Sequence, residues 1–401
     1  MSLISDLRIL KDAKVLSQRY LPEKLLFLDK QKRDLGIYLG YVLNDNVPPH
    51  MLLIGPRGTG KSTLIAIYKQ ELLKTIQKRG FNVKIGYTHA PQTAFSAFVQ
   101  LANDVGVDVP STGISYDLTI ARYEKACPDS ISIFIIDEID KIKDINDLLI
   151  QLTKRNEINS GVKGYCIIGL TNKQRIVSTI DRRNLSSFNH RIINTYEYDA
   201  TQTYQILSDR VDKAFHRNTL EDGVLEKISA HAAQRKGDCR FGLDVLLQAA
   251  ELAEKESSDK LSINIVDKAI DDVEFRFLYD TIARKTLTQQ YLLLKIALDK
   301  NIKGTLLYQW YSQVLGNDAL TSRRISEYLN ELIDDQFIER YYVRVRTGKQ
   351  SWLRLFGLES SQVIIAIATK NFLKLYGANL PDDSLDKIKV IKGKSNFSSL
   401  G

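Results

Sequence analysis

The stretch GPRGTGKS, residues 55–62, combines three glycines with a lysine and a serine at the spacing G-x-x-x-x-G-K-[ST]. The apolar run Met51–Ile54 before it predicts a buried strand, and residues 63–73 after it have the pattern of a helix. A loop of this composition between a strand and a helix is typical of proteins that bind nucleoside triphosphates. A glycine-rich turn that binds nothing is the alternative, and the filled motif positions favour the phosphate site.

Each residue type in this loop suits a phosphate chain. Glycines at positions 55, 58 and 60 let the backbone curl so that its N–H groups point at phosphate oxygens, and the dipole of the following helix adds positive potential. Lys61 is expected to reach the β- and γ-phosphates, and the Ser62 hydroxyl is expected to hold Mg²⁺. The residues predicted to bind nucleotide here are Gly58, Thr59, Gly60, Lys61, Ser62 and Thr63.

A second apolar run, residues 131–136, ends in the carboxylates Asp137 and Glu138. An uninterrupted apolar run is typical of a central parallel strand, and ligands bind at the carboxyl ends of such strands. We therefore predict Asp137 as a second Mg²⁺ ligand and Glu138 as the base that polarises an attacking water. An acidic loop that caps a helix is the weaker alternative.

A third strand is predicted in GYCIIGLTN, residues 164–172, which ends in Asn172. The amide of Asn172 could orient the attacking water or sense the γ-phosphate. An asparagine that ends a strand is, however, often only a turn residue.

The order of these signals, a P-loop followed by a D-E-x-D box and then a polar residue, resembles the layout of a AAA+ ATPase. Residues 203–254 have apolar residues at three- and four-residue spacing, which predicts a bundle of amphipathic helices and corresponds to the family's lid. In that lid, Arg240 stands at the position of the family's second sensor arginine, which can bridge the γ-phosphate to the lid. The alternative is that Arg240 is a surface residue without a role. A helix N-terminus carries positive potential, so helix electrostatics give no reason for an arginine there.

Within this superfamily the flanking segments are similar to archaeal replication initiators, relatives of the origin recognition complex and of its helicase-loading partner. The similarity follows the order VLSQRYLPEKL (residues 15–25, the lead-in segment), VGVDVPSTGIS (residues 105–115), IIDEIDKIKD, GLTN and GDCR. It implies nucleotide contacts from Val15 and Tyr204, and an insertion near Pro110 that touches DNA. It also implies slow hydrolysis and a long-lived ADP state.

Two positions depart from that family's pattern. Leu28 stands in LLFLDKQ where the family usually has a histidine or arginine followed by an acidic residue. The arginine finger, which completes a neighbouring subunit's site, has no clear place because SSF replaces S-R-F; its candidates are Arg182, Arg183 and Arg191. We therefore do not predict activation in trans by a second copy.

After Asp280 the sequence predicts three short helices followed by two antiparallel strands. Three helices and a basic hairpin form a winged helix, in which the third helix enters the major groove with its first residues nearest the bases. The buried face of that helix is predicted to comprise Ile325, Leu329 and Leu332. Its predicted DNA contacts are Thr321, Ser322, Arg323 and Arg324.

The hairpin RYYVRVRTGKQSWLRL, residues 340–355, contains five basic residues and no acidic one, and a turn is expected at residues 347–350. Alternation predicts one face with Val343, Val345, Leu353 and Leu355, and a second face with Tyr342, Arg344, Arg346, Trp352 and Arg354. A charge run alone is usually a solvated face, whereas arginines mixed with aromatics suit phosphate and sugar. Following a recognition-type helix, Arg344, Arg346 and Lys349 are predicted to contact DNA.

Length and composition complete the expected architecture. A chain of 401 residues is too long for one ordinary core. We expect an α/β AAA+ P-loop ATPase core (residues 1–198), an α-helical lid (199–280), a C-terminal winged-helix (α+β) domain (281–358) and a C-terminal extension (359–401). A net charge of +8 favours a polyanionic partner. Because the sequence has neither a bilayer-length apolar run nor a signal peptide at its start, we expect a cytoplasmic, nucleoid-associated location.

These features predict a slow ATPase that uses ATP, ADP and Mg²⁺, with catalytic roles for Glu138, Lys61, Asn172 and Arg240. Its expected partners are double-stranded origin DNA, a replicative helicase that it helps to recruit or load, and other initiator paralogues, with no membrane. Two alternatives remain open. One is a winged-helix transcription regulator whose nucleotide site is vestigial or only a switch, and the other is a signalling ATPase whose winged helix only packs against the lid.

Overall fold

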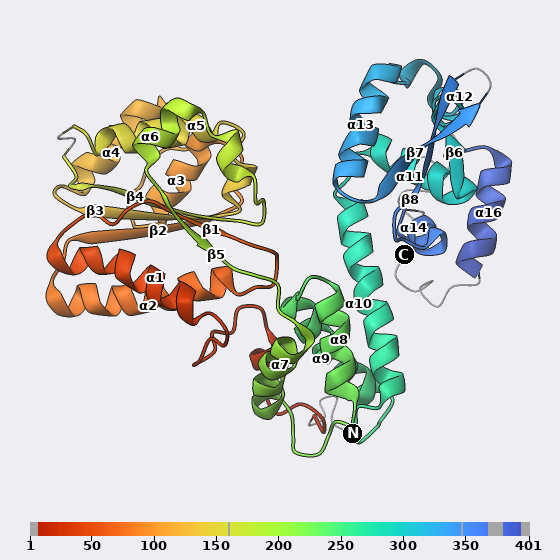
Figure 1. The fold of residues 1–401 in the computed structure, drawn as a ribbon, viewed down its shortest axis with the longest axis horizontal. Coiled ribbons are helices and arrows are strands. Elements are labelled where there is room, and N and C mark those ends of the chain that lie inside the picture. The colour runs from red at the N-terminus through yellow and green to blue at the C-terminus, as the bar shows by residue number, and fades with distance from the viewer. Residues whose placement is uncertain (1–6, 159–160, 346–347, 368–379, 394–401) are drawn as a thin grey trace. The chain divides into compact units, whose positions relative to one another are not determined.

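The structure describes residues 7–158, 161–345, 348–367 and 380–393. In this computed structural model the chain divides into two units, residues 1–269 and residues 270–401 (Figure 1). None of the helices within the described ranges combines the length and the apolarity that a membrane crossing requires.

The first unit is built on a five-stranded parallel sheet in the order β2-β3-β4-β1-β5. The strands are β1 Met51–Ile54, β2 Val83–His89, β3 Ile131–Asp137, β4 Gly164–Thr171 and β5 Arg191–Asn194. Every residue of β1 and β4 is buried, because helices cover both faces of the sheet. The register places His89 beside Asp137, at the edge where the carboxyl ends of the strands meet.

Helices α1 and α2 lie on one face of this sheet, and α3, α4, α5 and α6 lie on the other (Figure 1). Their bounds are α1 Asp29–Leu39, α2 Lys61–Arg79, α3 Ala94–Asp104, α4 Tyr116–Ala126, α5 Ile145–Arg155 and α6 Arg182–Phe188, with 3-10 turns η2 Gly40–Asn44, η3 Ile139–Lys141 and η4 Ile176–Thr179. On the second face, the Phe98 ring packs edge-on against Tyr123 and Phe134, with centroids 5.6 and 5.7 Å away. This aromatic cluster anchors α3 and α4 to β3.

The lid follows the sheet and consists of α7 Ala200–Ala214, α8 Val224–Gln234 and α9 Cys239–Lys255. Residues 7–12, before the 3-10 turn η1 (Ala13–Leu16), add to this lid rather than to the sheet. Lys11 N donates to Ala214 O at 2.8 Å, and His216 N donates to Ile9 O at 3.1 Å. The N-terminal segment is therefore paired with the end of α7. Helix α10, Ile263–Ala283, contains the division between the two units.

Between residues 284 and 358, the described part of the second unit has three helices and a three-stranded antiparallel sheet in the order β6-β8-β7. Its elements are α11 Leu287–Asp299, β6 Asn301–Lys303, α12 Gly304–Leu315, η5 Gly316–Asp318, α13 Ser322–Asp334, β7 Ile338–Val345 and β8 Gly348–Leu355. Ile325, Leu329 and Leu332 are buried, which confirms the predicted inner face of α13. The predicted fold class, an AAA+ core with a helical lid and a winged helix, is confirmed.

Two further helices, α14 Ser360–Ile367 and α16 Asp382–Gly393, follow the hairpin. Val363, Ile364 and Ile367 of α14 are buried, and so is Ile388 of α16. These side chains belong to the same hydrophobic cluster as Leu292 of α11. In the described residues beyond 358 the chain thus completes the core of the winged helix.

Candidate functional site

The P-loop connects β1 to α2, and two of its glycines have backbone conformations that other residues adopt with strain. Gly58 has φ +73° and Gly60 has φ +82°. A Cβ at Gly58 would also overlap Asp238 Oδ1, which caps the N-terminus of α9 in the lid. Position 58 therefore needs glycine for its φ angle and for the close approach of the lid.

Thr59 stabilises the loop from inside. Its side chain is buried; Oγ1 donates to Pro56 O at 2.9 Å and lies 2.7 Å from Thr195 Oγ1. The Tyr198 hydroxyl donates to Thr59 O at 3.1 Å. The structure thus turns this predicted nucleotide-binding side chain into the protein, which leaves only its backbone N–H for a phosphate.

Lys61 folds back onto the loop that precedes it. Its Nζ donates to Gly55 O at 2.7 Å and to Pro56 O at 2.6 Å. Burial and, to a smaller extent, the nearby Arg240 lower the pKa of Lys61 to about 8, against the opposing effect of Asp137. Phosphate oxygens would offer this half-buried ammonium charged acceptors in place of two neutral carbonyls.

Ser62 and Asp137 fit a divalent cation. Ser62 Oγ donates to Asp137 Oδ2 at 2.8 Å. Two oxygens in adjacent positions of an octahedron with Mg–O bonds of about 2.1 Å lie about 3.0 Å apart, so this pair needs little rearrangement to share one ion. The donor set is all oxygen, as Mg²⁺ prefers. Both predicted metal ligands are brought together.

Tyr87 joins this pair, although the sequence reasoning did not select it. Its hydroxyl donates to Asp137 Oδ2 at 3.3 Å, and burial next to Asp137 raises the pKa of Tyr87 to about 12. His89 Nδ1 lies 3.9 Å from the same oxygen. The signal was the parallel order of β2 and β3, because it places the carboxyl end of β2 beside Asp137.

The rest of the acidic box is fixed to the end of β4. Glu138 has φ +56°, a strained value for a residue with a side chain, directly after the strand that carries Asp137. The side chain of Asp140 is buried, accepts a 2.6 Å hydrogen bond from Thr171 Oγ1 and pairs with Lys173 at 3.4 Å. Asn172 lies between these two partners and is exposed. It follows that Asp140 holds the box in place, while Glu138 and Asn172 lie near the sheet edge.

A cavity of about 470 Å³ joins the P-loop to the lid. The loop and α2 contribute Gly58, Gly60, Ser62 and Thr63, and α9 contributes Arg240. Residues 17–22 and 24–26 close one side, together with Tyr87, Tyr198 and three residues of α7, namely Ile206, Asp209 and Arg210. The cavity has the size of a small-ligand pocket, and its wall contains four of the eight residues predicted to bind nucleotide.

Two residues that the resemblance assigned to the nucleotide are not in the cavity wall. Val15 is buried, and its carbonyl accepts a 3.5 Å hydrogen bond from Arg210 Nη1. Tyr204 is half-buried on α7. In their place the wall contains Tyr20 and Arg210, whose guanidinium lies 4.6 Å from the Tyr20 ring centroid. Sequence reasoning missed this pair because the two residues are distant in the chain.

The structure places the residues that depart from the family pattern, Leu28 and the three candidate arginine fingers. Leu28 is buried, and its Cδ1 lies 3.0 Å from the position that a Cβ at Gly60 would take, so an apolar residue here supports the P-loop. Arg182 and Arg183 on α6 and Arg191 on β5 are all exposed.

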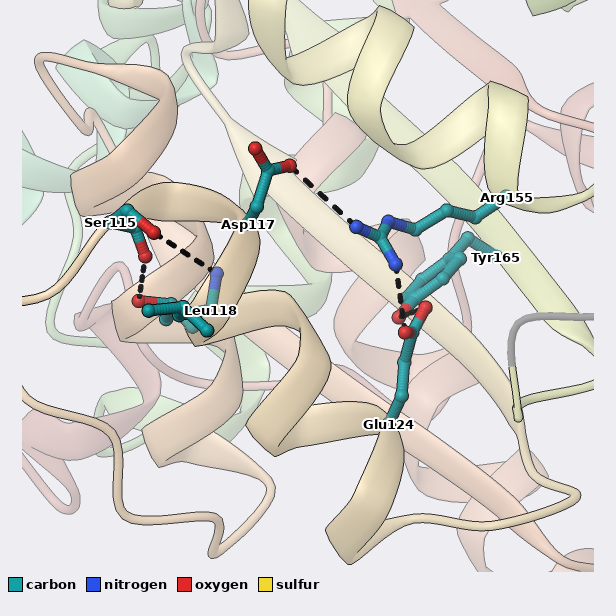
Figure 2. A network of polar contacts seen from close by, with 7 residues as sticks. Ser115, Asp117, Leu118, Glu124, Arg155 and Tyr165 are labelled. Atoms are coloured by element: carbon teal, nitrogen blue, oxygen red, sulfur yellow. Dashed lines mark hydrogen bonds and ion pairs between the residues drawn. The ribbon is translucent and has the colours of Figure 1, made fainter.

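The segment near Pro110 is the loop between α3 and α4. Polar contacts of Ser115 and Glu124 hold α4 in place (Figure 2). Ser115 caps α4 by accepting from Leu118 N at 3.3 Å. Glu124, at the other end of the helix, accepts from Arg155 Nη1 at 2.8 Å and from the Tyr165 hydroxyl at 3.1 Å. The helix that supports the loop is thereby fixed to α5 and β4.

In the second unit the predicted DNA contacts of α13 all face solvent. Thr321 is the N-cap of α13 and accepts from Arg324 N at 3.4 Å. Thr321, Ser322, Arg323 and Arg324 are exposed. Both arginines pair with Glu327, at 3.7 Å for Arg323 and 2.7 Å for Arg324.

The predicted faces of the hairpin were wrong. The register pairs Val343 with Gln350 and Arg344 with Lys349, so Val343 shares a face with Trp352, whereas Arg344 shares a face with Leu353. Strand β7 ends at Val345 and β8 begins at Gly348, so three of the four residues expected in the turn, 348–350, belong to β8.

Of the three basic residues predicted to contact DNA from this hairpin, Arg344 and Lys349 are exposed next to each other. Arg346 lies outside the described residues. Arg354 belongs to the other face, pairs with Glu339 and lies 5.3 Å from the Tyr341 ring centroid.

Comparison with known proteins agrees with this architecture. The family model of the AAA ATPases (ATPase family associated with various cellular activities) matches residues 51–196, and the model of the Cdc6 AAA+ ATPase-type lid domain matches residues 204–271. The fold and the site therefore define a AAA+ P-loop ATPase with a Cdc6-type lid.

The relatives sharpen this class. ORC1-type DNA replication protein 1 of Archaeoglobus fulgidus is 30% identical over 401 residues, which covers 96% of this chain and 97% of that protein. The ORC1-type DNA replication protein of Methanothermobacter thermautotrophicus is 31% identical, covering 81% and 87%. The chain belongs to the family of ORC1-type DNA replication proteins, and the predicted family resemblance is confirmed.

A solved structure of the Aeropyrum pernix ORC1 protein in complex with DNA has a TM-score of 0.81, with 27% identity, and covers 92% of this chain and all of that one. The Aeropyrum pernix ORC2 protein, solved as ADPNP–ADP complexes, has a TM-score of 0.60 at 19% identity and shares the fold.

Proposed function

We propose that this chain is an ATP-dependent replication initiator that binds double-stranded origin DNA and helps to recruit or load the replicative helicase. The observation that carries the proposal is the cavity that joins Gly58, Ser62 and Arg240, because it makes the lid part of the phosphate site. Membership of the ORC1-type family and the similarity to an ORC1 protein solved with DNA support the DNA partner.

The residues divide the nucleotide chemistry among them. Lys61 and the N–H groups of the loop hold the β- and γ-phosphates, Ser62 and Asp137 hold Mg²⁺, and Glu138 orients the attacking water. Bound Mg²⁺ would neutralise phosphate charge. Arg240 contacts the γ-phosphate and so couples the orientation of the lid to the bound nucleotide. Because hydrolysis is slow, ATP acts mainly as a conformational switch and not as an energy source.

The DNA contact is assigned to the second unit. Arg323 and Arg324 stand at the start of α13, with Arg344 and Lys349 exposed on the hairpin. Four cations on solvent-facing positions of a winged helix suit one groove and its flanking phosphates.

The test is footprinting of the purified full chain across genomic DNA, with ATP and with ADP. Protection confined to replication start regions and altered between the two nucleotides is expected. Protection spread over promoters, or indifferent to Lys61→Ala, would favour a transcription regulator with a vestigial nucleotide site. Absence of any duplex affinity at low salt would contradict the DNA assignment.

A further inference from the structure

One carboxylate on the exposed face of α13 holds two arginines. Arg324 Nη1 donates to Glu327 Oε2 at 2.7 Å, and Arg323 Nε lies 3.7 Å from Glu327 Oε1. The side chains of Arg323, Arg324 and Glu327 are 92%, 58% and 42% exposed, so all three point away from the core of the winged helix. The face that is expected to meet DNA thus carries a negative charge at its centre.

Helix stability alone does not account for this arrangement. Arg323 and Arg324 follow Thr321, the N-cap, and Ser322 in the first turn of α13. The positive end of the helix dipole disfavours cations in a first turn, and an arginine that precedes its glutamate is in the weaker of the two orders for an intrahelical pair. These residue types at these positions are explained better by what the helix face binds.

The two arginines are held to different degrees. The Arg324 guanidinium pairs with Glu327 and also lies 5.2 Å from the Tyr328 ring centroid. Within the part of the chain that the structure describes, Arg323 has only the longer contact to Glu327. Arg324 is therefore preorganised beside the carboxylate, whereas Arg323 can extend toward a ligand at the loss of one weak ion pair.

We propose that Glu327 determines the sequence specificity of α13, an inference that rests on the proposed function above. Its carboxylate competes with phosphate for both guanidinium groups and is itself repelled by phosphate. When α13 enters the groove these contacts loosen, and the carboxylate needs a new donor. Cytosine N4 is the base-edge donor that glutamate accepts from in the major groove. Duplexes with cytosine at that position are favoured, and all others leave the carboxylate unpaired.

The test compares Glu327→Gln with Asp334→Asn in the full chain. Both changes remove one negative charge from α13, and Asp334 is exposed at the far end of the helix. The probes are a duplex pool of randomised sequence and the duplex that the wild-type chain enriches from that pool. Glu327→Gln is expected to bind the random pool about fivefold more tightly while changing little on the enriched duplex, so its preference falls about fivefold. Asp334→Asn is expected to shift both affinities by the same factor.

Two further measurements complete the experiment. Glu327→Asp keeps the carboxylate and should retain most of the preference, and selection with Glu327→Gln should lose cytosine at one position. Equal preference in Glu327→Gln and wild type at matched melting temperature, or an enriched duplex that has no cytosine preference to lose, would overturn the inference while leaving duplex binding intact. A wild-type chain that binds neither probe would remove the proposed function and this inference with it.

Discussion

The Arg210 guanidinium lies 4.6 Å from the centroid of the Tyr20 ring, so a lid helix and the lead-in segment meet at the wall of the nucleotide cavity. Arg210 is buried, and burial lowers its pKa from the ordinary value. Among the described residues it forms no ion pair, and its charge is favoured by the nearby Asp209, by the Tyr20 ring and by Val15 O. A buried cation that no carboxylate contacts directly depends on such interactions, which makes the pair of Tyr20 and Arg210 a sensitive point of the cavity.

Arg210→Met should weaken ATP and ADP binding alike, by about tenfold, because a desolvated cation–π contact contributes roughly 1–2 kcal/mol to the wall. The matched control is Arg235→Met, which removes a guanidinium 4.7 Å from the Phe241 ring in the lid, outside the cavity wall. Titration calorimetry with both nucleotides measures the effect. Equal losses in the two variants would show that lid stability alone is involved.

Lys61→Met should abolish nucleotide binding and yet raise the melting temperature of the nucleotide-free protein at neutral pH. The pKa of Lys61 falls from 10.5 to about 8 in the folded state, so below pH 8 folding carries the cost of a buried charge. This cost disappears as the pH rises from about 8 to about 10.5, and folding stability rises across that window because the unfolded chain binds more protons.

Thermal unfolding of wild type and Lys61→Met at pH 7 and pH 10 measures how much the substitution raises the melting temperature. The first pH lies below the folded-state pKa of Lys61, about 8, and the second lies between it and the unfolded-state value of 10.5. The gain in melting temperature should be larger at the lower pH. A gain that is the same at both pH values would mean that lost packing or lost hydrogen bonds, and not the buried charge, set the stability of this position.

Arg155→Met should destabilise the first unit by about 3 kcal/mol, because it leaves the buried carboxylate of Glu124 without its cation. The two side chains are only 17% and 8% exposed, and their contact is 2.8 Å. The double variant Arg155→Met, Glu124→Met should recover part of the loss. Urea denaturation gives the free energies of unfolding, and a double variant that is less stable than the single one would contradict this account.

Arg344→Ala with Lys349→Ala should weaken duplex binding and reduce the salt slope by about 2, one for each phosphate contact removed. Arg354→Ala is the control, because Arg354 lies on the other face of the hairpin and is paired with Glu339. It should leave the salt slope unchanged. Shift assays over a range of salt concentrations measure both, and equal slopes for the two variants would place the DNA contact elsewhere.

The parts of the fold that followed from the sequence are those with local causes. The P-loop, the strand that ends in Asp137 and the inner face of α13 each depend on residues that are neighbours in the chain. Tyr20 and Arg210 are 190 residues apart in the sequence, and no local pattern predicts their contact.

The predicted faces of the hairpin were wrong for a different reason. Alternation correctly separates the two faces within one strand, but the register across the turn decides which face of β7 joins which face of β8. A shift of one residue in that register exchanges the partners. The turn length sets the register, and turn length is hard to read from a stretch such as RTGKQ, where several loops are possible.

The pairing of Ile9 and Lys11 with the end of α7 has a practical meaning for experiments on nucleotide-driven motion. A fluorophore attached close to Leu7 would travel with the lid, not with the sheet. Placed opposite a second dye on α4, whose back is held by Glu124 and Arg155, it would turn lid rotation into a distance signal without any label near the phosphates.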